Sequence, residues 1–175
     1  MSADWWLFGY GSLTWRPDFE YVEALPAYLP GWSRRFWQGS EDHRGVPGDP
    51  GRVVTLVEAQ EARCLGRLFR VAGVHAERIR AQLDHREKGG YQRREAEFVS
   101  REGRSLGGAT FYIATPENRN WLGPAPVESI ARQVARAVGP SGHNREYVER
   151  LYAWLEAHGE VDDETAALVR ALRAL

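Results

Sequence analysis

The order of the secondary-structure signals along the chain constrains its fold more than any other feature. Through the first two thirds, short runs of apolar and β-branched residues are bounded by Gly and Pro, a pattern typical of strands. These runs cover residues 5–8, 28–37, 52–57, 64–71, 91–99 and 106–115. In the last third, apolar residues recur with helical spacing and predict helices over residues 126–138, 144–157 and 162–175. Strands followed by helices, without regular alternation, favour an α+β fold with an antiparallel or mixed sheet.

The size of the chain favours a single domain over residues 1–175. At 19.8 kDa it can bury roughly 70% of the surface that an unfolded chain exposes, so a complete active site fits without an obligatory protein partner. A net charge of −1 creates no long-range field that would attract nucleic acid or a membrane. The segment MSADWWLFGYGSL lacks the basic start and apolar core of a signal peptide, and no run has the ~18 apolar residues of a membrane span. We therefore expect a cytoplasmic protein.

Neither a metal site nor a cysteine nucleophile is predicted. The single cysteine, Cys64, excludes an internal disulfide and lies in the apolar run CLGRLFRV, where a free cysteine usually packs in a core. The five histidines are scattered and lack the spacing of a metal site.

One predicted helix, over residues 75–88, interrupts the strand region and ends at Gly89. On a helical wheel, an arc of about 80° contains Ala76, Ile79, Leu83 and Glu87. Glu87 thus continues an apolar stripe, and a poorly solvated carboxylate has a raised pKa that suits proton transfer near neutral pH. The alternative is a surface charge, because Arg80 projects to nearly the same sector and glutamates in a last helical turn are usually exposed.

A glycine-rich turn, FGYGSL, follows the first predicted strand. Gly9 and Gly11 allow a tight turn whose N–H groups can face an anion, and Ser12 adds a hydroxyl donor. Such a nest suits a carboxylate or a phosphate. The alternative is a plain turn at the end of a strand. The segment lacks the third glycine of a dinucleotide fingerprint and the Gly-Lys-Ser/Thr of a P-loop, which disfavours a nucleotide site.

The segment GSEDHRGVPGDPG, residues 39–51, holds four glycines and two prolines among charged residues. This composition predicts an exposed loop. Its 13 residues make it longer than most connections, which favours a functional loop.

Five blocks of unusual composition follow one another along the chain: WLFGYGSLTWRPDF, GWSRRFWQGSEDHRGVPGDPGRVVTLVE, DHREKGGY, NWLGPAP and GPSGHNREY. In this order and spacing they resemble ChaC-type proteins, the glutathione-specific gamma-glutamylcyclotransferases. The resemblance spans residues 6–147. It implies a small closed β-barrel, mixed or antiparallel, with flanking helices. The helices of residues 126–175 are then expected to pack on the barrel.

The resemblance also implies an activity, the cleavage of glutathione to 5-oxoproline and Cys-Gly by a cytosolic lyase without a cofactor. It makes Glu87 the catalytic acid/base and Tyr112 a further contact of the substrate site. The gamma-glutamyl group would be held by a cradle of Gly9, Tyr10, Gly11, Ser12, Leu13 and Thr14. Apart from the resemblance, the length of the loop of residues 39–51 leads us to expect that this loop, with Arg44, closes over the Cys-Gly half of the substrate.

Two alternatives stay open. The chain could be a cyclotransferase for other gamma-glutamyl amides, or a non-catalytic regulatory protein that binds a gamma-glutamyl group. The presence of both Glu87 and the glycine turn argues against a pure binder, because binding alone does not require a carboxylate on an apolar stripe.

Overall fold

The computed structural model describes residues 2–86 and 90–175. The chain divides into two compact units, unit 1 with Met1–Ser33 and Leu56–Arg119, and unit 2 with Arg34–Thr55 and Asn120–Leu175. The single domain expected from length, with its C-terminal helices packed on the barrel, stays a prediction.

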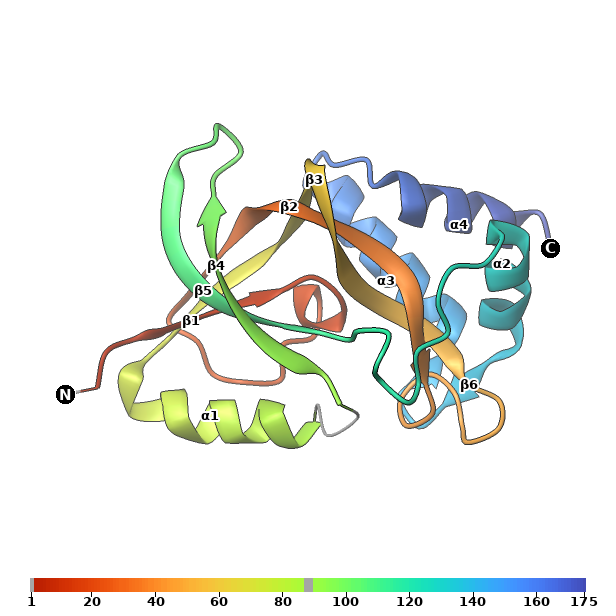
Figure 1. Cartoon of the computed structure of the whole chain (residues 1–175), viewed down its shortest axis with the longest axis horizontal. Coiled ribbons are helices and arrows are strands. Elements are labelled where there is room, and N and C mark those ends of the chain that lie inside the picture. Colours follow the sequence, from red (N-terminus) through yellow and green to blue (C-terminus); the bar gives the residue numbers. More distant parts are fainter. Residues whose placement is uncertain (1, 87–89) are drawn as a thin grey trace. The chain divides into compact units, whose positions relative to one another are not determined.

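Five strands form a closed barrel in the order β1-β3-β2-β4-β5 (Figure 1). Strand β1 runs antiparallel to β3 and parallel to β5, and β4 runs antiparallel to β5, so the barrel is mixed. The α+β class and the small mixed barrel are therefore confirmed. The strand bounds are β1 Trp5–Gly9, β2 Glu23–Ser40, β3 Gly51–Val71, β4 Gln92–Val99 and β5 Ser105–Ile113.

One strand prediction was wrong. The sequence predicted separate strands over residues 52–57 and 64–71, whereas β3 is a single strand of 21 residues. Residues 58–63, EAQEAR, are polar and largely exposed, yet they continue the strand. A strand needs apolar residues only where a face is buried, so a polar stretch at the surface does not end it. Cys64, just after this stretch, is buried as predicted.

Helix α1, Gly73–Arg86, belongs to unit 1 and lies along the barrel strands (Figure 1). Its apolar stripe is confirmed, since Ala76, Ile79 and Leu83 are all buried. They share a core cluster with residues of β1, β3 and β5, namely Trp5, Leu7, Val71 and Tyr112. The predicted continuation at Glu87 and the predicted stop at Gly89 lie outside the described residues.

Unit 2 contains three helices that contact one another, and their predicted ranges are confirmed to within two residues (Figure 1). A two-residue hairpin, β6 Val138–Gly139 with β7 Gly142–His143, joins the first helix to the second. The helices are α2 Val127–Arg136, α3 Asn144–Ala157 and α4 Asp163–Arg173. In the described part of the chain, no helix is both long and apolar enough to cross a bilayer.

Candidate active site

The site predicted from sequence begins where β1 and β5 end. These strands are parallel neighbours, with Leu7 paired to Thr110, so their C-terminal ends lie at the same edge of the barrel. The Tyr10 hydroxyl, just after β1, donates a hydrogen bond to the Tyr112 carbonyl oxygen at 2.5 Å. Both tyrosines are buried. Two residues that lie 102 positions apart in sequence, and that were both predicted for the site, are thus in direct contact.

The glycine-rich turn after β1 folds into a single 3-10 turn, Ser12–Thr14. The Thr14 backbone N–H and hydroxyl both donate to the Gly11 carbonyl oxygen, at 3.0 and 2.7 Å. The Thr14 side chain is buried, so its hydroxyl braces the turn from within. A substrate contact by Thr14 stays a prediction.

Gly9 is required by a close approach inside this turn. A Cβ at position 9 would lie 2.5 Å from Cβ of Leu13, closer than two carbon atoms can pack. Leu13 in turn packs against the core cluster that contains Tyr112 and Leu83. The turn is therefore held between β1 and the buried side of α1, while the anion-binding role of Gly11 and Ser12 stays a prediction.

Arg67 of β3 supports the same turn from outside and was not predicted for the site. It pairs in register with Gly9, and its guanidinium donates to the Thr14 carbonyl oxygen at 3.2 Å. Its position is fixed further by the rings of Tyr21 and Phe69, whose centroids lie 5.5 and 5.0 Å away. Only the β1–β3 register reveals this contact, because the two residues lie 53 positions apart.

Asp84 also contacts this group, although the sequence did not predict it. The Tyr112 hydroxyl donates to Asp84 Oδ1 at 2.7 Å, which ties the end of β5 to the last turn of α1. Asp84 opens the block DHREKGGY and lies three positions before Glu87. At the other end of that block, Tyr91 packs against the core cluster that includes Tyr112. A polar residue one helical turn before a candidate acid/base was the only sequence signal for Asp84.

We call this group the β1–β5 edge, defined by residues 9–14, Asp84 and Tyr112.

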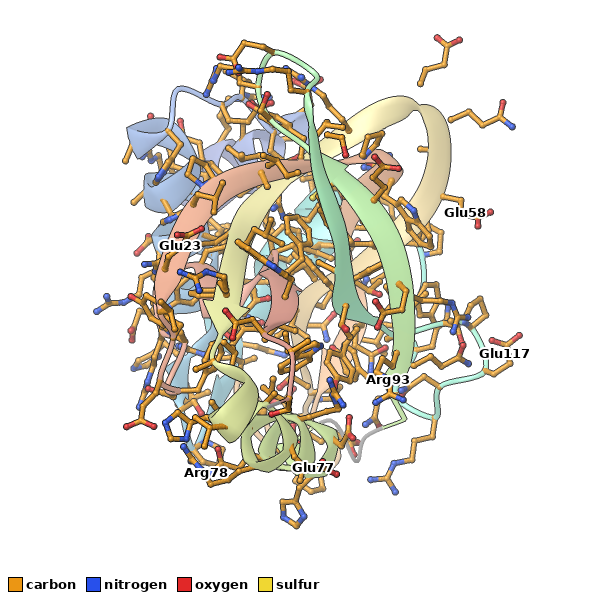
Figure 2. The ribbon with its side chains drawn as sticks, turned by 90° about the vertical axis from the view of Figure 1, so that its left-hand side faces the viewer. Glu23, Glu58, Glu77, Arg78, Arg93 and Glu117 are labelled. Atoms are coloured by element: carbon orange, nitrogen blue, oxygen red, sulfur yellow. The ribbon has the colours of Figure 1, made fainter. Side chains whose placement is uncertain are left out.

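Charged side chains of unit 1 lie around the outside of the barrel and α1 (Figure 2). Glu77 and Arg78 are exposed on α1, and Arg78 pairs with Glu20 at 2.9 Å. The buried face of α1 thus carries Leu83 toward the cluster, while its exposed face carries ordinary surface charges.

The segment of residues 39–51 is only in part the exposed loop that its composition predicted. Its ends belong to β2 and β3, and Arg44 and Gly45 are buried within unit 2. Backbone crowding explains this, since a Cβ at Gly45 would lie 2.2 Å from the Gly51 nitrogen. Asp42 and residues 46–49 are the exposed part of the segment, as predicted.

Arg44 makes its described contacts within unit 2. Its guanidinium donates to the His143 carbonyl oxygen at 2.9 Å and lies 3.8 Å from Glu146, and its backbone N–H donates to the Ser40 hydroxyl. These bonds give Arg44 a structural role in the connection between β2 and β3. The predicted contact with the Cys-Gly half of a substrate stays a prediction.

Comparison with known proteins identifies the family of this chain. A family model described as ChaC-like protein matches residues 5–175. The chain belongs to the ChaC-like family.

Members of the ChaC-like family are similar to the chain over most of its length. Human glutathione-specific gamma-glutamylcyclotransferase 1 is 43% identical over 172 residues, which are 95% of this chain and 78% of the human protein. The Saccharomyces cerevisiae glutathione-specific gamma-glutamylcyclotransferase is 32% identical and covers 83% of each chain. A crystal structure of a gamma-glutamyl cyclotransferase specific to glutathione from yeast superposes with a TM-score of 0.92 at 28% identity, covering 99% of this chain and 97% of that one. The resemblance noted in the five sequence blocks is confirmed.

Within residues 2–86 and 90–175, no group of three or more His, Cys, Asp or Glu side chains is arranged to bind a metal ion.

Proposed function

We infer that this ChaC-like protein degrades glutathione, a lyase reaction that releases 5-oxoproline and Cys-Gly. The observation that carries this inference is the similarity of nearly the whole chain to relatives named glutathione-specific gamma-glutamylcyclotransferases, with 95% of the chain aligned to the human protein. The β1–β5 edge supports it, because the turn of residues 9–14 and Tyr112 meet there as the resemblance requires.

The proposed reaction is an intramolecular acyl transfer. The α-amine of the gamma-glutamyl group attacks the side-chain carbonyl carbon, which forms the C–N bond of a five-membered lactam. The bond from that carbon to the cysteine nitrogen then breaks. One proton must leave the attacking amine and one must reach the departing amine, so a single acid/base group can transfer the same proton. No redox step is involved.

Glu87 is our proposal for that acid/base. The proposal rests on the resemblance in the block DHREKGGY and on the apolar stripe that leads to Glu87 in the sequence. Supporting evidence comes from the described residues on either side, because Leu83 and Tyr91 both pack with the cluster of Tyr112. A carboxylate that is withdrawn from water has a raised pKa and accepts a proton from an amine more readily.

The turn of residues 9–14 is our proposal for the substrate cradle. The reaction needs the amine and the carbonyl carbon of one flexible side chain to be held together, and orientation of this kind can lower a barrier by several kcal/mol. The hydrogen bonds of Thr14 and Arg67, which hold this turn in place, support the proposed role. The backbone N–H groups of the turn from Gly9 to Leu13 would bind the substrate α-carboxylate.

Arg44 is retained as a proposed contact for the Cys-Gly half of glutathione. Because its guanidinium also bonds the His143 carbonyl oxygen within unit 2, Arg44→Ala is expected to lower stability as well as affinity. A binding role therefore requires a raised KM for glutathione in variant protein that is shown to be folded. An unchanged KM in such a sample would remove Arg44 from the site.

The substrate range is tested by comparing glutathione with other gamma-glutamyl amides. An Arabidopsis thaliana relative, 41% identical over 175 residues, is named gamma-glutamylcyclotransferase 2-3 without a stated substrate. The test is release of 5-oxoproline from glutathione, gamma-glutamyl-alanine and gamma-glutamyl-lysine, with a chelator present. Turnover of glutathione alone supports the proposed function. Turnover of the other amides instead would favour the broader cyclotransferase, and no turnover by folded protein would favour a regulatory binder.

A further inference from the structure

Unit 2 contains a cavity of about 340 Å³ whose lining includes none of the residues proposed for the glutathione reaction. It is bounded by β2, by Ala125 and by the helices α2 and α4. Its volume falls in the range of small-molecule sites. The apolar part of the lining includes Phe36, Val127, Ile130, Ala167 and Leu168, and the charged part consists of Arg35, Asp163 and Glu164.

The charges in this lining are not balanced. Two carboxylates, Asp163 and Glu164, face the cavity with one guanidinium, Arg35. Arg35 and Glu164 lie 3.8 Å apart, too far for a hydrogen bond, and their side chains are 32% and 27% exposed. The nearby Asp162 belongs to a different pair, because it accepts from Arg34 at 2.7 Å and from Thr165 at 2.8 Å.

Glu164 is the group that is least well compensated. Burial raises its pKa above the usual value, and the repulsion from Asp162 adds to that rise. The attraction of Arg35 and a hydrogen bond from the Phe36 backbone N–H act in the opposite direction but do not cancel the effect of burial. A carboxylate in this state gains more from an added cation than a solvated one does.

We propose that this cavity binds a small molecule that carries an ammonium group on an apolar body. The ammonium lies against Glu164 and Asp163, and the apolar body packs against Phe36, Ile130 and Leu168. Both an apolar amine and an apolar α-amino acid have this chemistry. The carboxylate of the amino acid would face the guanidinium of Arg35, the third charged group of the lining. None of the residues that line this cavity is among those proposed for the glutathione reaction.

Three probes of one shape separate the contributions of charge and apolar surface. Phenethylamine carries the ammonium alone, phenylalanine carries both charges, and 3-phenylpropionate carries the carboxylate alone. Each is titrated into ¹⁵N-labelled full-length protein, and the amide shifts of Ile130, Ala167 and Leu168 are followed. We expect the two ammonium compounds to bind with dissociation constants of roughly a millimolar, as is usual for ligands of this size. The one that binds more tightly identifies the amine or the amino acid as the better source.

Two variants test the residues directly. Glu164→Gln keeps the shape of the side chain and removes its charge, so binding of the ammonium compounds should weaken at least about fivefold. Ala167→Leu fills the cavity, so binding should be lost while the melting temperature does not fall. Glu128→Gln is the matched control, because Glu128 is an exposed glutamate on α2 outside the lining and should leave binding unchanged.

Several results would overturn the proposal. These are no shift with either ammonium compound at ten millimolar, equal binding of 3-phenylpropionate, or unchanged affinity in Glu164→Gln. A melting temperature that rises by a few degrees with saturating ligand in the wild type, and not in Ala167→Leu, would support it independently of the titration.

Discussion

The Tyr112 hydroxyl donates a hydrogen bond to the Asp84 carboxylate at 2.7 Å, and this bond joins the last turn of α1 to the end of β5. The Tyr112 carbonyl oxygen accepts a second bond, from the Tyr10 hydroxyl at 2.5 Å. One residue therefore links α1, β5 and the turn after β1. We infer that Asp84 positions this edge of the barrel, while the chemistry is carried out by other groups.

The first prediction concerns Asp84. Asp84→Ala should lower kcat/KM for glutathione about tenfold, because Tyr112 loses its acceptor and small displacements of reacting groups are costly. Asp84→Asn should restore most of the activity, since its amide oxygen can accept the same bond. Steady-state kinetics on both variants checks this. Glu77→Ala, on the exposed face of α1, is the control.

A double-mutant cycle extends this test. Tyr112→Phe removes the donor, so adding Asp84→Ala to it should cost little more in unfolding free energy than Tyr112→Phe alone. The expected coupling is about 1 kcal/mol. Additive effects of the two changes would show that the bond does not contribute in solution.

The second prediction concerns Gly9. In Gly9→Ala the new methyl group would lie 2.5 Å from Cβ of Leu13, so the turn must shift. We expect loss of most turnover with the barrel still folded, measured by kinetics and circular dichroism. Gly108→Ala in β5 is the matched control, because its Cβ would meet only the Ala96 carbonyl oxygen at 3.8 Å. Wild-type kinetics in Gly9→Ala would mean that the turn has no part in catalysis.

The third prediction concerns the buried Arg52 of unit 2. Its guanidinium donates to the carbonyl oxygens of Phe36 and Gly123 at 2.9 and 2.8 Å and to Gln133 at 2.9 Å, and burial lowers its pKa. Arg52→Met leaves these acceptors without a donor and should destabilise the protein by roughly 3 kcal/mol. Denaturant unfolding measures this.

The control for Arg52 is Arg132→Met. Arg132 is an exposed arginine on α2, and its replacement should change the unfolding free energy by less than about 0.5 kcal/mol. Equal effects of the two substitutions would contradict the role given to Arg52.

The fourth prediction concerns pH. The hydrogen bond from the Arg70 guanidinium and the bond from the Gly73 backbone N–H lower the pKa of the Asp4 carboxyl below its ordinary value. A carboxyl group whose pKa is lower in the folded than in the unfolded protein stabilises the folded state at any pH above its unfolded-state pKa. This stabilisation is lost as the pH falls through the pKa of the folded state. Asp4→Asn should therefore melt below the wild type at neutral pH, and the difference should shrink below about pH 4. A difference that does not change with pH would exclude this ionic contribution.

Local patterns predicted much of the fold. The Gly and Pro boundaries located the strands, and helical spacing located α2, α3 and α4. The stripe of Ala76, Ile79 and Leu83 is buried as expected. Only the family resemblance predicted that the barrel is closed, because the parallel pairing of β1 with β5 leaves no local signal in the sequence.

The missed residues share one physical cause, which is that their contacts are distant in sequence. Asp84 meets Tyr112 across 28 positions and Arg67 meets Thr14 across 53. The part of the loop prediction that was wrong, the exposure of Arg44, has the same cause. The charge of Arg44 and the nearby glycines indicated exposure, yet its side chain is buried and donates to the carbonyl oxygen of His143, 99 positions away.

The central claim is that Glu87 transfers the proton in the cyclisation of glutathione. The most direct measurement is the rate of 5-oxoproline release from millimolar glutathione by the wild type and by Glu87→Gln, with circular dichroism to show that both are folded. We predict that kcat falls at least about 100-fold in Glu87→Gln, because the amide cannot accept the proton. A folded Glu87→Gln protein with a kcat near that of the wild type would contradict the account.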